Sequence, residues 1–107
     1  MSINADTLKE AARLGLEETL LPLVQGLEED AAERLRLRMD RDLPELAARI
    51  SSAALRGDQT MVDALEDVPA LWFEQERIRV VAVQRALIRG AVRAVFRTLI
   101  EVAAAAA

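Results

Sequence analysis

The segment after Pro69 constrains the fold of this chain most, because it reaches the last residue with only Gly90 to weaken a helix. One glycine costs a helix about 1 kcal/mol and does not have to end it. The segment therefore predicts a single helix of about 39 residues, about 58 Å long at the rise of an α-helix. The rest of the protein has to pack along that helix.

The composition favours the same fold class. The chain of 107 residues contains 20 Ala and 16 Leu but only three Phe and Trp residues, which is typical of helical proteins. The stretch from Arg34 to Met39 alternates charged and apolar residues as a half-buried strand would. No partner strand is evident, so we favour a helix there and leave the strand open. We expect an all-α fold, a small helical bundle of about four helices with a long C-terminal helix, in a single domain over 1–107.

The first helix is predicted to begin at Asn4 or Asp6, since either side chain can cap exposed backbone N–H groups. Its apolar stripe contains Ala12, Leu16, Leu20, Leu23 and Leu27. Pro22 lies within this stripe and lacks the N–H that the helix needs. We therefore predict a bend or a helix end within a few residues of Pro22.

Two further helix starts are predicted downstream. Asp42, Pro44 and Glu45 resemble a capping box, so we expect a middle helix to begin there and to end at Gly57. Asp58 or Thr60 can then cap a short helix before Asp67 and Pro69 open the long one. The buried face of the middle helix is predicted to contain Leu43, Leu46, Ala47, Ile50 and Ala54, and the short helix carries Met61, Val62 and Leu65.

The long helix has an apolar arc that is predicted to face the core. The arc contains Val80, Val81, Leu87, Ile88, Ala91, Val92, Val95, Leu99 and Val102. Near its end Phe96 and Ile100 fall on the opposite side, so the helix becomes apolar all round. One layer of neighbouring helices cannot cover such a surface, and we expect it to form a contact between copies of the chain or with another protein. The predicted interface residues are Trp72, Phe96, Leu99, Ile100 and Val102.

Trp72 belongs to the only aromatic cluster, Leu71-Trp72-Phe73, whose three side chains must point in three directions. Two of them can be buried with the third partly exposed. Alternatively, Trp72 anchors a neighbouring subunit, since Trp is enriched at protein interfaces.

Four arginines follow one another every fourth residue on the side of the long helix opposite the arc: Arg85, Arg89, Arg93 and Arg97. Guanidinium groups suit phosphate, so this row is a possible contact for phosphate or for an acidic partner. The net charge of −4 and the lack of aromatic residues near the row argue against nucleic acid. The alternative is a solvated face, or one paired with residues 1–67, which carry 15 acidic and eight basic side chains.

The residue types argue against an enzyme. Cys, His and Tyr are absent, and the serines Ser2, Ser51 and Ser52 have no imidazole to activate them. The carboxylates at Glu17-Glu18, Glu28-Glu29-Asp30 and Asp40-Arg41-Asp42 lack the histidines of a di-iron bundle and are better explained by helix capping. We expect no catalytic, cofactor-binding or metal-binding residue.

No targeting signal or membrane span is evident, so we expect a soluble protein of the cytoplasm or one incorporated in a virion. The leading hypothesis is a non-enzymatic structural or adaptor subunit of a homo-oligomer, in its most concrete form a component of a phage or prophage particle that contacts other assembly proteins. One alternative is a small helical regulatory binder, such as an inhibitor or an antitoxin-like protein, that acts on one target. A second is a nucleic-acid-associated assembly factor that uses the arginine row.

Overall fold

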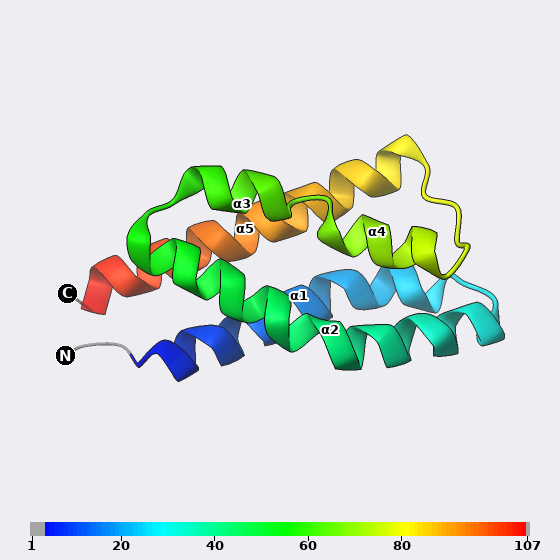
Figure 1. Ribbon diagram of the computed structural model, residues 1–107, viewed down its shortest axis with the longest axis horizontal. Helices are drawn as coiled ribbons and strands as arrows, with labels where there is room; N and C mark the ends of the chain where they lie inside the picture. The colour runs from blue at the N-terminus through cyan, green and yellow to red at the C-terminus, as the bar shows by residue number, and fades with distance from the viewer. Residues whose placement is uncertain (1–3, 107) are drawn as a thin grey trace.

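The computed structural model describes residues 4–106, and within this range the fold is all-α (Figure 1). It contains α1 (Ala5–Gln25), α2 (Glu29–Arg56), α3 (Gln59–Leu65), α4 (Val68–Gln75) and α5 (Ala82–Ala106). The prediction of a small helical bundle with a long C-terminal helix is confirmed. The alternative of a strand at residues 34–39 is wrong, because these residues lie within α2.

The three long helices form the body of the bundle. α1, α2 and α5 pack against one another in pairs, and α1 runs antiparallel to both of the others (Figure 1). α3 and α4 each pack on both α2 and α5, and they form the connection that returns the chain to the start of α5. The longest dimension of the molecule, 45 Å, is close to the length of about 42 Å expected for the 28 residues of α2.

α1 begins and ends close to where the sequence predicts. The Asn4 side chain accepts a hydrogen bond of 2.9 Å from the backbone N–H of Asp6. The helix ends at Gln25, three residues after Pro22, so the prediction of a helix end near this proline is confirmed. The buried stripe follows Leu16 and Leu20 to Val24, whereas Leu23 and Leu27 are only partly buried.

α2 corrects the prediction that a helix begins at Asp42. The helix runs without interruption through Pro44, and the Asp42 carboxylate does not cap a helix but accepts hydrogen bonds from Arg41. A proline inside a helix costs about 3 kcal/mol. The continuous stripe of buried side chains on both sides of Pro44 offsets this cost, because a break would turn half of it out of the core. The stripe includes the predicted buried face and comprises Ala32, Leu35, Met39, Leu43, Leu46, Ala47, Ile50, Ala53 and Ala54.

The predicted signals around α3 are confirmed. Gly57 ends α2 with a φ of 64°, a left-handed conformation that favours glycine. The Asp58 carboxylate accepts a hydrogen bond of 3.0 Å from the N–H of Met61 and so caps α3. α4 then begins at Val68 with Pro69 in its first turn.

The prediction of one helix of about 39 residues after Pro69 is wrong, because the chain leaves the helix after Gln75 and re-enters one at Ala82. Arg77 has a φ of 60°, and the N–H groups of Arg77 and Ile78 donate to Glu74 and Phe73, the pattern of a Schellman motif. Ile78 is thereby buried, and its burial offsets the strain of a positive φ at a residue other than glycine. The Gln84 side chain accepts from the N–H of Val81 and supports the new start.

Candidate functional site

The arginine row on α5 pairs with carboxylates of the same chain. Arg85 forms ion pairs with Glu74 and, at 3.6 Å, with Asp67. Arg89 donates through Nε to Asp67 at 2.7 Å, and these hydrogen bonds lower the pKa of the Asp67 carboxyl below its ordinary value. The row therefore fastens α5 to the connection between α3 and α4.

Arg93 makes the most buried pair of the row. Its Nε donates to Oε1 of Glu66 at 2.5 Å, and its Nη2 donates to Oε2 of Glu66 at 3.1 Å. The guanidinium group therefore binds both carboxylate oxygens. The Glu66 side chain is only 8% exposed. Within residues 4–106, only Arg97 of the four forms no ion pair.

The structure buries three of the five residues predicted to form a contact between copies. Trp72, Phe96 and Leu99 are at most 5% exposed and belong to the core of the same chain. The premise that neighbouring helices cannot cover the end of α5 is wrong for Phe96 and Leu99, because both are buried within the chain. Ile100 is partly exposed and Val102 is 43% exposed, so these two remain at the surface.

A different apolar surface lies on the solvent side of α5. We call it the outer seam and define it as Val83, Leu87, Gly90 and Ala94, which are all exposed. Val83 is 71% exposed and Leu87 57% exposed, whereas the predicted arc placed Leu87 in the core and omitted Val83. The spacing of four, three and four residues repeats like the positions of a coiled-coil seam, and this signal could have identified the surface from the sequence.

A shallow hollow of about 240 Å³ adjoins the outer seam where α5 crosses α1. Ala94 and Thr98 line it from α5, and Ala11 and Gly15 line it from α1. Glu18 is the one charged residue among those that line it. The outer seam therefore continues into a mostly apolar depression.

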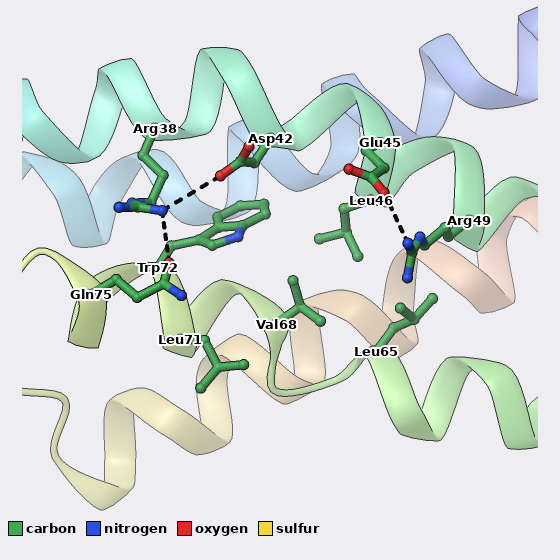
Figure 2. A pocket seen from close by; sticks show the side chains of 10 residues that line it. All are labelled: Arg38, Asp42, Glu45, Leu46, Arg49, Leu65, Val68, Leu71, Trp72 and Gln75. Carbon is green, nitrogen blue, oxygen red and sulfur yellow. Dashed lines mark hydrogen bonds and ion pairs between the residues drawn. The ribbon is translucent and has the colours of Figure 1, made fainter.

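A groove of about 380 Å³ lies between α2 and the segment that contains the end of α3 and α4 (Figure 2). The wall from α2 is mostly charged, with Arg38, Asp42, Glu45 and Arg49 in order along the helix and one apolar residue, Leu46. The opposite wall is mostly apolar and comprises Leu65, Val68, Leu71, Trp72 and the polar Gln75.

The charges of this groove are neutralised within the chain (Figure 2). Arg38 donates a hydrogen bond of 2.7 Å to Gln75 and lies 3.7 Å from Asp42, while Arg49 donates to Glu45 at 2.9 Å. The buried Nε of Arg38 has no hydrogen-bond acceptor and lies 3.6 Å from a carboxylate oxygen of Glu76. The groove is thus a mixed polar and apolar surface without a cluster of like charge.

No arrangement suited to metal binding is found among residues 4–106. No group of three or more acidic, His or Cys side chains gathers closely enough there to hold a metal ion. Ser51 is buried and its hydroxyl donates to the backbone oxygen of Ala48. Within the same range, no helix combines the length and apolarity needed to cross a bilayer.

No protein-family model, curated protein or solved structure matches this chain.

Proposed function

We propose that this protein is a non-enzymatic structural or adaptor subunit that associates with copies of itself through the outer seam of α5. The observation that carries the proposal is the exposure of Val83 and Leu87, two large apolar side chains one turn apart on the same helix face. Fully burying a side chain of this size is favourable by about 1.5–3 kcal/mol.

The charges near the seam also support a contact between proteins. The residues of the seam and the exposed Ala86 are uncharged, and the neighbouring Arg89 and Arg93 already pair with carboxylates of their own chain. An unpaired buried charge would oppose association. Of the arginines beside the seam, only Arg97 forms no ion pair within residues 4–106, and it lies beyond Ala94, at the end of the seam. A copy of the same chain is the simplest partner, since every molecule supplies the same surface.

Light scattering coupled to size-exclusion chromatography tests the proposal. The parent protein is expected to have a mass above that of one chain at tens of micromolar, and a double variant Val83→Glu and Leu87→Glu is expected to be monomeric with unchanged helix content. A matched control is Leu37→Glu with Leu55→Glu, since these α2 side chains are 64% and 51% exposed and lie outside the seam. A parent protein that is monomeric at this concentration would contradict the proposal.

The groove between α2 and α4 favours a second candidate, a small helical binder that regulates one target. An amphipathic helix of a partner would lay its apolar face on Val68 and Leu71 and its polar face toward α2. Such a binder stays monomeric until its target arrives, so the same mass measurement separates the two candidates.

The nucleic-acid alternative is disfavoured by the ion pairs of the arginine row. If these arginines serve the fold, the parent protein should not be retained on DNA, and Arg89→Gln with Arg93→Gln should leave this behaviour unchanged. Tight retention that weakens with salt would instead favour the alternative. The role of a phage or prophage particle component stays a prediction from the sequence.

A further inference from the structure

We infer that two copies of this chain pair their α5 helices antiparallel, so that Leu87 of each copy lies on Gly90 of the other and Val83 lies on Ala94. This inference rests on the proposed self-association and specifies its register. It follows from the sizes of the seam side chains, the hollow beside them and the charges beyond them.

The outer seam divides into a large half and a small half. Val83 and Leu87 are the large half, and Gly90 and Ala94 are the small half. The pairs Leu87 with Gly90 and Val83 with Ala94 share one midpoint, between residues 88 and 89. An antiparallel pairing about that midpoint therefore places a large side chain on a small one at every level of the seam, which gives the close packing of protein interiors. A parallel pairing would oppose Leu87 to Leu87 and leave a gap at Gly90.

Gly90 has no role in packing within its own chain. A Cβ built on Gly90 meets no atom within 4 Å, although glycine weakens a helix relative to alanine. A position that is costly for the helix and unexplained by the chain's own core fits the close approach of a second helix. The antiparallel register supplies that helix, with Leu87 of the second copy over Gly90.

The hollow between α1 and α5 lies beside Ala94, where the antiparallel register places Val83 of the second copy. Ala94 lines it together with Thr98, Ala11 and Gly15. In the antiparallel register Val83 of the second copy lies on Ala94, beside this hollow. Its side chain would therefore enter a depression that the chain itself leaves open.

The charges beyond the seam are complementary in the same register. Arg77 and Arg79 are exposed in the segment before α5, and Glu101 is exposed near the end of α5. None of the three forms an ion pair within the described residues. In the antiparallel register Glu101 of one copy lies just beyond the first residue of α5 in the other, near the segment that contains Arg77 and Arg79, and this happens twice in each dimer. The neighbouring Glu76 already lies 3.6 Å from Arg38 of its own chain. A parallel pairing would place Glu101 beside Glu101.

Cysteine cross-linking tests the register directly, because the chain contains no Cys. Two single variants, Val83→Cys and Ala94→Cys, are prepared separately, checked for unchanged helix content by circular dichroism, and oxidised alone or after mixing. In the antiparallel register residue 83 faces residue 94, so a disulfide-linked dimer should form on mixing. Each variant alone should cross-link severalfold less, since equal residues are about 16 Å apart along the helix and a disulfide needs Cα atoms within about 7 Å.

Each outcome decides the inference. Mixed dimers that exceed the single-variant dimers support the antiparallel register. Efficient cross-linking of Ala94→Cys with itself would show a parallel pairing and overturn it. A lack of cross-links in a protein that light scattering shows to be oligomeric would overturn the register and leave the proposed function in place. A monomeric protein would overturn both.

Discussion

Gly15 of α1 and Gly90 of α5 are both helical glycines, yet their surroundings differ. A Cβ on Gly15 would come within 3.1 Å of the Cγ2 of Val95, whereas a Cβ on Gly90 would meet no atom within 4 Å. Gly15 thus allows α1 to approach the inner face of α5 closely. Gly90 lies on the outer face, where nothing in the chain needs the missing side chain. The inner face of α5 is therefore packed within the chain, whereas the outer face around Gly90 is free to contact another molecule.

The largest expected effect is on the free energy of unfolding, and it should differ between Phe96 on the inner face of α5 and Leu87 on the outer face. Phe96 is 2% exposed, so Phe96→Ala should lower the free energy of unfolding by about 3–5 kcal/mol through a cavity in the core. Leu87→Ala should change the stability of the monomer by less than about 0.5 kcal/mol but reduce self-association. Urea denaturation and light scattering measure the two quantities. Equal losses of stability at both positions would break the distinction between the faces.

Replacing each of the two glycines by leucine tests whether the inner and outer faces of α5 differ. Gly15→Leu would force a side chain against Val95, and we expect a loss of about 1–3 kcal/mol in the free energy of unfolding from overpacking. Thermal unfolding followed by circular dichroism checks this result. A variant as stable as the parent would mean that α1 and α5 do not approach as closely as the structure has them.

Gly90→Leu should act in the opposite direction on the isolated chain. The side chain would extend into open space, and the better helix propensity of Leu should raise the free energy of unfolding by about 0.8 kcal/mol at dilutions where the chain is monomeric. The same variant should associate more weakly, because the new side chain would fill the space over position 90 that Leu87 of a second copy would otherwise occupy. Stronger association, measured by light scattering, would contradict the proposed register.

The smallest effect is the pH dependence of the link between α5 and Asp67. The hydrogen bonds from Arg89 lower the pKa of Asp67. A carboxyl whose pKa is lower in the folded state stabilises the fold above its unfolded value of about 3.9, and this contribution is lost as the pH falls through the folded pKa. Arg89→Gln should raise the pKa of Asp67 in an NMR titration of the carboxyl group. Arg97→Gln is the control and should leave it unchanged, because Arg97 forms no ion pair within residues 4–106.

Two helix ends show why part of the fold was predictable and part was not. α2 and α4 end in the same motif, in which one residue has a φ near +60°: Gly57 in α2 and Arg77 in α4. Glycine adopts this conformation without strain, so the first end is evident from the sequence. At Arg77 no local signal exists, and the chain turns there because Ile78 is buried against the core.

The candidate site was predicted only in part, for the same reason. The helical periodicity identified an apolar arc on the C-terminal helix and an arginine row opposite it, and Ile88, Val92, Val95 and Leu99 of the arc are indeed buried. Periodicity does not say how many neighbours a helix has. Phe96 was therefore assigned to a contact between copies although the chain itself covers it, and the exposed Val83 was missed.

The sequence by itself determined that this protein is helical and where several helices begin and end, since Asn4, Gly57 and Asp58 act within one turn of the chain. Only the tertiary structure decided that α2 continues through Pro44, that the last helical segment divides at Arg77, and which face of α5 is free. The physical reason is one of range and magnitude. Caps and breakers act locally with about 1–3 kcal/mol each, whereas burial adds over a whole stripe and depends on partners that lie far away in the sequence.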